Sequence, residues 1–468
     1  MIVMKFGAAA ASDVARLEDL TLIVGETAGI GMPVVVVCSA LSGMTDALIG
    51  AARAAARGNE AAADEARRSL WGRHRTLAER LVSDEWEREI LYREWADLLK
   101  VFDRITRSIG TLGEHSPRSI DAVAAIGERF MAHLIATTLR QGGQPARMID
   151  AAELIVTDDH YGAAQPLIEP TNEQIRSRLL PLLQSRIVPV VTGYIGATES
   201  GVVTTLGRGG GDYSATLIGA AIGAEAVEIW SDVDGIMTAD PKIVAGARTL
   251  DEISYAEAAE IAMLGAEVLH PRTLAPIAAE QIPLRIRNIL RPDHAGTRVV
   301  AEPQPSPHAA HTIISARALA LLGVQAFPVA AEWIWPPDLT QRILMRCAAA
   351  GIEVLTLTQS FSERTLTIAV RAADAEFTRD LLTDTVALER RSGLLQEVTA
   401  IKPVALVAVI STPDSDDLVA KTLASLAGAR AHVLSLAHGV ASSHISFTLP
   451  EREVDAVVRT LHRDLELA

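Results

Sequence analysis

The feature that most constrains the fold is the alternation, through the first 300 residues, of short β-branched apolar runs with segments of helical length. Residues 33–38, 187–191 and 226–230 are compact and rich in Val and Ile, as strands buried on both faces of a sheet are. Between such runs lie Ala-rich and Leu-rich stretches, for example 127–140 and 213–223. This alternation predicts an α/β fold with a mostly parallel central sheet and helices on both faces.

Residues 51–115 depart from this alternation. They carry dense Ala, Glu and Arg and hardly any strand signal, which predicts an inserted helical hairpin or bundle. Their tryptophans, Trp71, Trp86 and Trp95, are interpreted as packing anchors rather than as a ligand-binding box, because large aromatic side chains dominate burial in helical layers.

A Pro-rich stretch over 302–307 predicts the end of the first domain. We expect a catalytic domain over 1–300 and a linker over 301–311. Beyond the linker the order strand, helix, strand, strand, helix, strand is expected twice. The two units would be ferredoxin-like βαββαβ domains over 312–400 and 401–468, related as a degenerate internal repeat.

The composition narrows the class of function. The chain of 468 residues has a formal charge of -15, which argues against nucleic acid or an anionic membrane as its main partner. No apolar run approaches the ~20 residues that a membrane-spanning helix needs. The only cysteines, Cys38 and Cys347, are interpreted as buried apolar residues, and their scarcity fits a reducing cytoplasm. We expect a cytoplasmic enzyme that acts on small molecules.

A glycine-rich segment, residues 204–214 (TTLGRGGGDYS), lies between a strand and a helix-forming run. Such a turn lets backbone N–H groups approach an anion at the start of a helix. Arg208 adds a planar guanidinium suited to a carboxylate or a phosphate. A tight corner between a strand and a helix needs glycine in any case, so a purely structural role stays open for this segment.

Lys5 lies at the carboxyl end of the first predicted strand and is followed closely by Gly7. Open α/β sheets bind ligands at this edge, and a lysine ammonium there can neutralise a phosphoryl group in transfer. A lysine that only protects the end of a strand is an equally good interpretation from this residue alone. Neither G-x-x-x-x-G-K-[ST] nor a G-x-G-x-x-G at the first turn is present, so a phosphate site has to be built in another way.

Four further motifs occur in order along the chain. They are residues 34–46 (VVVVCSALSGMTD), 127–130 (GERF), 229–242 (IWSDVDGIMTADPK) and 265–273 (GAEVLHPRT). Together with the opening Lys5–Gly7 and the loop around Arg208, they resemble the aspartokinases of the amino acid kinase family. The resemblance covers essentially the whole chain.

The resemblance implies a reaction. Aspartokinases use ATP and Mg²⁺ to phosphorylate the β-carboxylate of L-aspartate, giving 4-phospho-L-aspartate, the first step toward lysine, threonine and methionine. A carboxylate is already ionised and nucleophilic at pH 7, so no strong general base is needed. Positioning and charge neutralisation are expected to dominate the catalysis.

The resemblance also implies how the substrate is held. Arg208 would bind the α-carboxylate of aspartate and Glu128 its α-ammonium, while Ser39 and Thr45 hydrogen-bond the substrate. Paired charges of opposite sign select an amino acid over a simple diacid. For Glu128 alone, an acidic residue favoured at the start of a helix is the structural alternative.

On the phosphate side, Lys5 and Gly7 would face the transferring group, and Asp212 would orient Lys5 or its own loop. Four residues fall where the family binds nucleotide: Ser231, Asp232, Asp240 and Lys242. Aspartates at such positions could equally build turns. No protein side chains are expected to form a metal site.

Several positions depart from the family pattern, all on the phosphate and nucleotide side. They are Ala8, Ala9 and Ala10 in place of Gly-Thr-Ser, Gly211 in place of serine, Met237 in place of tyrosine, and Glu267 in place of lysine. The methyl group of Ala8 could obstruct a phosphate or exclude a positive φ. Each lost hydroxyl removes a hydrogen bond with a net stabilisation of about 0.5–1.5 kcal/mol. Glu267→Lys is expected to raise the affinity for ATP.

These departures leave two alternatives open. One is a catalytically impaired, aspartokinase-like amino acid sensor or partner subunit, and the other is a kinase for a different acidic amino acid.

Residues 350–363 resemble the strand pair of the ACT domains in aspartokinases. The resemblance implies a feedback amino acid bound where such domains pair edge to edge, and a homodimer or higher homo-oligomer. Gln359 is the candidate effector contact, although polar alternation on an ordinary strand explains it almost as well. For Trp333 and Trp335 an interface or packing role is favoured over a ligand cage.

Overall fold

The computed structural model describes residues 1–264, 269–304, 312–327, 335, 337–411, 417–439 and 444–467. The chain forms two compact units. The first comprises Met1–Ile236, Asp251–Tyr255 and Leu269–Pro303, and the second comprises Met237–Leu250, Ala256–Val268 and Gln304–Ala468. The domain boundaries given above stay predictions.

The first unit contains an eight-stranded sheet in the order β3-β5-β2-β1-β8-β10-β11-β9. The strands are β1 (Ile2–Phe6), β2 (Val34–Cys38), β3 (Ala146–Ile149), β5 (Val188–Thr192), β8 (Ala226–Ser231), β9 (Glu252–Ser254), β10 (Leu284–Asn288) and β11 (Thr297–Val300). All pairs are parallel except β10 with β11. The prediction of an α/β fold with a mostly parallel sheet is confirmed.

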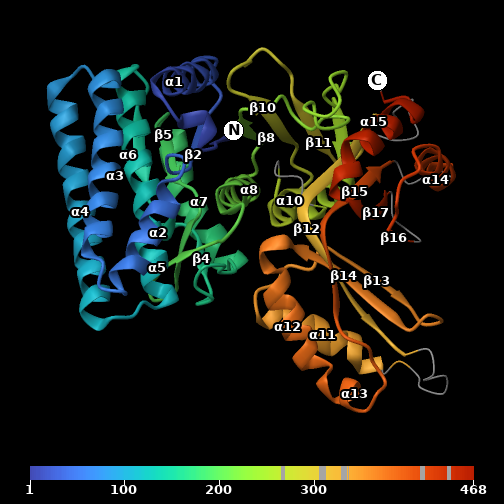
Figure 1. The fold of residues 1–468 in the computed structure, drawn as a ribbon. Coiled ribbons are helices and arrows are strands. Elements are labelled where there is room, and N and C mark those ends of the chain that lie inside the picture. The colour runs from blue at the N-terminus through green and yellow to red at the C-terminus, as the bar shows by residue number, and fades with distance from the viewer. Residues whose placement is uncertain are drawn as a thin grey trace. The chain divides into compact units, whose positions relative to one another are not determined.

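Helices cover both faces of this sheet (Figure 1). On the face of Met4 and Phe6 lie α1 (Val14–Gly29), α2 (Met44–Ala55), α3 (Glu60–Leu81), α4 (Glu85–Leu112) and α6 (Ile126–Gln141), which share one apolar core with that face. On the other face lie α7 (Ile168–Gln184) and α8 (Gly210–Ile222), with α10 (Pro271–Ala279) against α8. Lys5 alternates with Phe6 along β1, so its side chain lies on the α8 face.

The helical insertion is built on α3 and α4, which Figure 1 shows beside α6. Trp95 is fully buried, its ring stacks on Phe130 with 5.2 Å between centroids, and its indole N–H donates to the Phe130 carbonyl at 3.0 Å. Trp71 packs edge-on against Trp95. These two tryptophans are packing anchors, as predicted.

Trp86 corrects part of that prediction, because it is 70% exposed. The buried residues of α4 recur every three or four positions at Leu91, Trp95, Leu99 and Phe102. Trp86 lies in the first turn of the helix and off this stripe, so its ring points to solvent.

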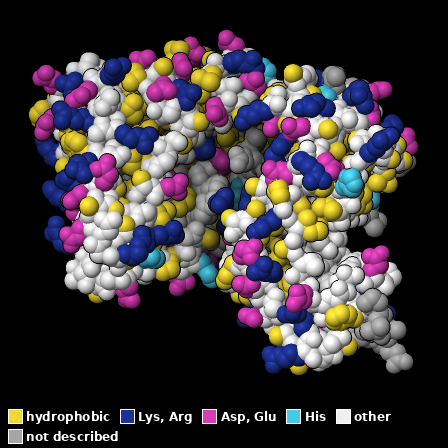
Figure 2. All heavy atoms as spheres, viewed as in Figure 1, with side chains coloured by type: hydrophobic (Ala, Val, Ile, Leu, Met, Phe, Trp, Pro, Cys, Tyr) yellow, Lys and Arg dark blue, Asp and Glu magenta, His cyan; other side chains and the backbone are white. Residues whose placement is uncertain are grey.

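The surface of the insertion carries charges of both signs. Figure 2 shows Lys and Arg side chains interspersed with Asp and Glu over α3 and α4. Among them are the ion pairs of Arg67 with Asp103 and of Lys100 with Asp97. Within the described ranges, every helix is too short or too polar to cross a bilayer.

A smaller sheet, in the order β4-β6-β7, lies in the same unit. Its strands are β4 (Val156–Thr157), β6 (Ile195–Thr198) and β7 (Val203–Thr205). β7 leads directly into the glycine-rich loop and α8. The short helix α5 (Pro117–Ala124) contacts β7.

The second unit contains a six-stranded antiparallel sheet in the order β13-β14-β12-β15-β17-β16. The strands are β12 (Thr312–Gln325), β13 (Thr356–Ser360), β14 (Thr365–Arg371), β15 (Thr399–Ile410), β16 (Ser435–His438) and β17 (His444–Pro450). The helices are α9 (Tyr255–Met263, whose first residue belongs to the first unit), α11 (Pro337–Ala349), α12 (Ala375–Thr385), α13 (Ala387–Arg391), α14 (Leu418–Gly428) and α15 (Val454–Asp464).

Two apolar cores lie along this sheet, and the long strands β12 and β15 join them. Ile313, at the start of β12, packs in the core of Phe447 and α15, whereas Leu322, later in β12, packs in the core of α11 and α12. Thr399–Ile401 of β15 pair with one half of β12, and Leu406–Ile410 pair with the other. The two ferredoxin-like halves therefore share strands, a feature that the sequence repeat did not indicate.

Cys38 and Cys347 are fully buried, as predicted, and burial raises the pKa of both thiols. Trp335 is also buried, in the core of α11 and α12, which agrees with the packing role favoured for it. Trp333 lies outside the described residues.

Candidate active site

The carboxyl ends of the central strands meet at one edge of the sheet. Gly7 follows β1, Ser39 follows β2, Gly193 follows β5, and β8 ends at Ser231. Short backbone bonds tie these ends together: the Gly7 N–H donates to the Trp230 carbonyl at 3.1 Å, and the Gly193 N–H donates to the Cys38 carbonyl at 2.8 Å. Residues far apart in the sequence thus share the edge where open α/β sheets bind ligands.

Lys5 and Asp212 form an ion pair at this edge. The Lys5 Nζ lies 2.5 Å from Asp212 Oδ1, and both side chains are largely buried. Asp212 lies in the first turn of α8, the helix that covers the Lys5 face of the sheet. The structure therefore pairs the lysine expected to face the phosphoryl group with the aspartate expected to orient it.

Ser39 and Gly211 border the same small space as Lys5. A methyl group added at Gly211 would lie 3.3 Å from the Ser39 Oγ and 3.4 Å from the Lys5 Cε. A methyl group added at Gly7 would lie 3.4 Å from the Lys5 Nζ. The absence of side chains at these two glycines leaves room beside the lysine ammonium.

Glu128 lies in the first turn of α6 and is only 4% exposed. One carboxylate oxygen accepts a long bond from the Ala40 N–H at 3.5 Å, and the other has no hydrogen-bond partner among the described residues. Burial raises the pKa of Glu128 to about 7. A helix-terminal role does not account for a buried carboxylate oxygen left unpaired, whereas a cationic ligand would satisfy it.

Thr45 and Arg208 lie on segments that open to solvent. Thr45 is half-buried in the first turn of α2, one residue after Met44 and two after Gly43. Arg208 is exposed in the loop between β7 and α8, and no ion pair of its guanidinium is found among the described residues.

The glycines that flank Arg208 have structural reasons of their own. Gly207 and Gly209 both have positive φ, at 77° and 67°. A methyl group at Gly209 would lie 2.4 Å from the His270 Cβ. Backbone conformation and close packing therefore explain these two glycines, which give no separate evidence of ligand binding. Within the loop, only Arg208 supports a functional role.

The Ala-rich turn after Gly7 has an ordinary backbone. Ala8 has φ -57°, which any residue adopts, so its methyl group causes no strain here, and the expected obstruction of a phosphate stays a prediction. Ala9–Ala11 form a 3₁₀ turn, and Ala10 and Ala11 are buried in the core that holds Phe6 and Trp230.

Arg16, which the sequence analysis missed, closes this turn. Its guanidinium donates to the Ala9 carbonyl at 2.7 Å and to the Ser12 hydroxyl at 2.6 Å. The signal for it was weak, because an arginine in the first turn of a surface helix is ordinary. The turn in which Ala9 and Ala10 replace threonine and serine is nevertheless packed and hydrogen-bonded.

The four predicted nucleotide residues divide between the units. Ser231 and Asp232 are in the first unit, and the Ser231 hydroxyl donates to Asp232 at 3.2 Å. Asp240 and Lys242 are in the second unit, where the Asp240 carboxylate accepts the Lys242 N–H at 2.9 Å and so builds a turn. Their shared part in nucleotide binding stays a prediction.

The remaining predicted positions add little to the site. Gln359 lies on β13, and its side-chain oxygen accepts a hydrogen bond from the Thr340 hydroxyl at 3.1 Å. Its role as an effector contact stays a prediction. Met237 lies in the second unit, and its carbonyl accepts a bond from the Thr312 hydroxyl at 2.6 Å. Glu267 lies outside the described residues.

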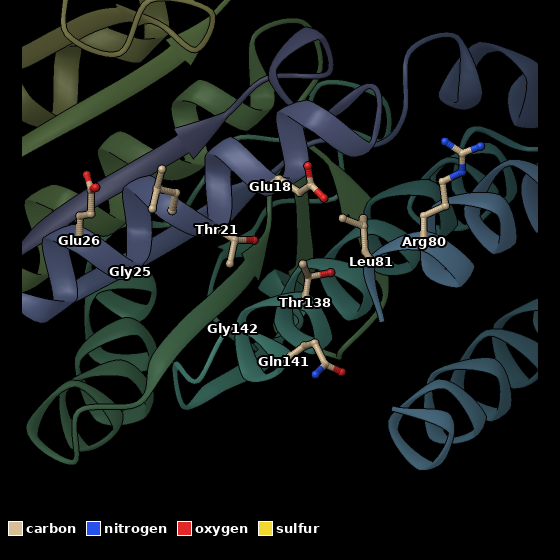
Figure 3. A pocket seen from close by; sticks show the side chains of 10 residues that line it. Glu18, Thr21, Gly25, Glu26, Arg80, Leu81, Thr138, Gln141 and Gly142 are labelled. Atoms are coloured by element: carbon tan, nitrogen blue, oxygen red, sulfur yellow. The ribbon is translucent and has the colours of Figure 1, made fainter. Parts of the chain in front are cut away.

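A separate cavity of about 550 Å³ lies among α1, α3 and α6 (Figure 3). It is lined by Glu18, Thr21, Leu22, Gly25, Glu26, Arg80, Leu81, Thr138, Gln141 and Gly142. None of the predicted site residues lines it, and its walls combine carboxylates, hydroxyls and one exposed leucine without a buried unpaired group.

Residues 1–288 match the sequence model of the amino acid kinase family. That stretch is more than half of the chain and holds the paired Lys5 and Asp212 as well as Glu128 and Arg208. The chain therefore belongs to the amino acid kinase family.

Particular relatives resemble the whole chain. The lysine-sensitive aspartokinase 3 of Escherichia coli is 29% identical over 482 residues, which cover 99% of each chain. The crystal structure of E. coli aspartokinase III with aspartate and ADP, in the R-state, superposes with a TM-score of 0.82 at 28% identity and covers 100% of both chains. The T-state structure of that enzyme with lysine and aspartate gives 0.81 at 28% identity and covers 99% of both.

Proposed function

We propose that this chain is an aspartate kinase, which transfers the γ-phosphoryl group of ATP to the β-carboxylate of L-aspartate and releases 4-phospho-L-aspartate and ADP. The observation that carries the proposal is the buried pair of Lys5 and Asp212 at the end of β1, beside Ser39. The likeness over the full chain to an aspartokinase that was solved with aspartate and ADP supports it.

In this proposal the amino acid is held by groups of opposite charge. The α-ammonium of aspartate pairs with Glu128, one of whose buried oxygens has no hydrogen-bond partner among the described residues. The α-carboxylate pairs with Arg208, and the hydroxyls of Ser39 and Thr45 hydrogen-bond the substrate. A bound ammonium would favour the ionised form of Glu128 and offset the cost of burying its charge.

The chemical step needs little from the protein beyond placement. A β-carboxylate oxygen attacks the γ-phosphorus, the bond to the β–γ bridging oxygen breaks, and ADP leaves with that electron pair. No proton has to be removed, because the carboxylate is ionised at pH 7. Lys5 would stabilise charge on the transferring group, and Asp212 would hold the lysine ammonium in place.

The nucleotide would lie along the strand ends of the first unit, with Gly7 leaving space near Lys5 and with contacts from Ser231 and Asp232. For Asp240 and Lys242, in the second unit, nucleotide binding stays a prediction from the family resemblance. Mg²⁺ supplies charge neutralisation to the phosphates when bound. In the part of the chain that the structure describes, no three His, Cys, Asp or Glu side chains gather as a dedicated metal site would require. At kinase sites Mg²⁺ is usually bound through the substrate phosphates, one or two carboxylates and water.

A sensor or partner subunit is the second candidate. The closed turn over Ala9–Ala11 and the bare Gly211 offer no side-chain hydroxyl to a phosphate, whereas Glu128 and Arg208 are kept. Such a protein would bind an amino acid and transfer phosphate poorly or not at all.

A coupled assay of ADP release decides between these candidates, with L-aspartate, L-glutamate and succinate compared and ATP binding measured in parallel. We expect ADP release that depends on L-aspartate and is lost in Lys5→Met. The control Lys100→Met replaces an exposed lysine of α4 and should leave the rate unchanged. Aspartate binding without turnover would support the sensor, and turnover only with L-glutamate would replace the proposed substrate.

The second unit is proposed to bind a feedback amino acid and to pair with a second copy. The likeness to the lysine-bound T-state structure supports this proposal, and Gln359 on β13 is the proposed effector contact. A cytoplasmic location is proposed as well. Light scattering with and without L-lysine tests the pairing, and a monomer under both conditions would contradict it.

A further inference from the structure

Asp121 on α5 has a buried carboxylate, and both of its oxygens accept hydrogen bonds. The residue is 2% exposed. One oxygen accepts the Gly162 N–H at 2.8 Å and the Thr205 N–H at 2.9 Å, and the other accepts the Thr205 hydroxyl at 2.9 Å. Burial raises the pKa of this carboxyl, and the three donated hydrogen bonds oppose that shift. Burying a carboxylate charge costs folding free energy, and Asp121 has no cationic partner among the described residues. The three groups that donate to this carboxylate therefore indicate what it contributes.

These three bonds fix the base of the loop that carries Arg208. Thr205 is the last residue of β7, and Arg208 follows three positions later. Between them, the Leu206 N–H donates to the Tyr194 carbonyl at 2.9 Å. Gly207 lies so close to the neighbouring segment that an added methyl group would be 3.1 Å from the Gly162 carbonyl. The Asp121 carboxylate thus holds both the strand that leads into the loop and the segment on which the loop rests.

We infer that Asp121 is a positioning residue for amino acid binding: it sets the place at which the Arg208 guanidinium meets the α-carboxylate of the substrate. The inference rests on the proposed function, because it assumes that Arg208 binds that carboxylate. In this inference Asp121 does not touch the substrate: the hydrogen bonds that its carboxylate accepts come from Gly162 and Thr205. Its effect is transmitted through Thr205 and the loop.

The variant Asp121→Asn keeps the shape of the side chain and replaces one acceptor oxygen with an NH₂ group, which cannot accept. We expect the KM for L-aspartate to rise about tenfold or more, with kcat and the KM for ATP within about twofold of the wild type. The matched control Asp84→Asn makes the same change at the start of α4, where the carboxylate accepts the Trp86 and Glu87 N–H groups. This control should leave the KM for L-aspartate unchanged.

A double-mutant cycle separates positioning from general stability. The dissociation constant for L-aspartate is measured by calorimetry in the wild type, Asp121→Asn, Arg208→Ala and the double variant. If Asp121 acts through Arg208, the asparagine substitution weakens binding in the wild type and has no further effect in the Arg208→Ala background. Full additivity of the two losses would overturn the inference.

Two further outcomes separate the positioning role of Asp121 from the proposed function. If Asp121→Asn does not fold, Thr205→Val removes only the hydroxyl donor, and it should raise the dissociation constant a few-fold in the wild type and not in Arg208→Ala. If the wild type does not bind L-aspartate at all, the proposed function fails and this inference fails with it. Binding by the wild type together with an additive cycle contradicts the positioning role alone.

Discussion

Glu128→Gln should stabilise the free protein at alkaline pH while it weakens the binding of L-aspartate. In the folded chain the Glu128 carboxylate is buried and one of its oxygens has no partner among the described residues, so ionisation is penalised. In the unfolded chain the same group ionises freely. A neutral glutamine of the same shape removes the penalty and also removes the charge that the α-ammonium of the substrate needs.

The size of the effect follows from the pKa of Glu128, which burial raises from 4.5 to about 7. The folded chain keeps a proton that the unfolded chain has lost, so the penalty begins as the pH rises above 4.5 and is complete above 7. At ~1.4 kcal/mol per pKa unit, the wild type loses about 1 kcal/mol at pH 5.5 and about 3 kcal/mol at pH 8. Glu128→Gln should recover these amounts.

Urea unfolding followed by tryptophan fluorescence measures this difference, because Trp95 and Trp230 are buried in the unit that contains Glu128. The gain in the free energy of unfolding should grow by about 2 kcal/mol between pH 5.5 and pH 8. A gain that does not change with pH would refute the reasoning, because it would show that the Glu128 carboxylate is solvated or paired in the folded protein.

Burial lowers the pKa of His74 from 6.5 to about 4, so the unfolded chain takes up a proton before the folded chain does. The free energy of unfolding of the wild type should therefore fall by up to about 3 kcal/mol as the pH drops from 6.5 to 4. His74→Leu should flatten this part of the pH profile in urea titrations, and an unchanged slope would contradict the burial of a neutral His74. Trp95→Ala should cost about 3–5 kcal/mol, whereas Trp86→Ala should cost less than about 0.5 kcal/mol, and equal losses would contradict the packing described for α4. Gly211→Ser should raise kcat/KM for ATP about two- to tenfold, because it returns a hydroxyl beside Lys5 and Ser39. The bulkier Gly211→Val should lower kcat/KM. A lower kcat/KM with serine would contradict this, because it would show that catalysis requires the space beside Lys5 to stay free of a side chain.

The central sheet was predictable because its signal is local. Residues 34–38 are five consecutive buried residues of β2, and a β-branched run of that length has few other uses. The helices at 127–140 and 213–223 were found to within three residues at each end, because apolar periodicity and flanking glycines mark them. The meeting of Lys5, Ser39 and Ser231 at one edge then follows from parallel strand direction alone.

The contacts that the sequence did not reveal depend on the tertiary structure. The exposure of Trp86 depends on which side of α4 faces α3, and the ordinary φ of Ala8 depends on the 3₁₀ turn that Arg16 closes. Asp121 could have been noticed as an acidic residue among buried neighbours of α5, but its partners Gly162 and Thr205 lie 41 and 84 residues away. The sharing of β12 and β15 between two cores is likewise a matter of long-range pairing.

Trapping the product with hydroxylamine tests the proposed phosphoryl transfer most directly. An acyl phosphate formed from L-aspartate and MgATP reacts with hydroxylamine to give aspartyl hydroxamate, which is counted against the ADP released. We expect one hydroxamate per ADP in the wild type and neither product in Lys5→Met. ADP released without hydroxamate, or equal yields from Lys5→Met, would contradict the transfer of phosphate to the aspartate carboxylate beside Lys5.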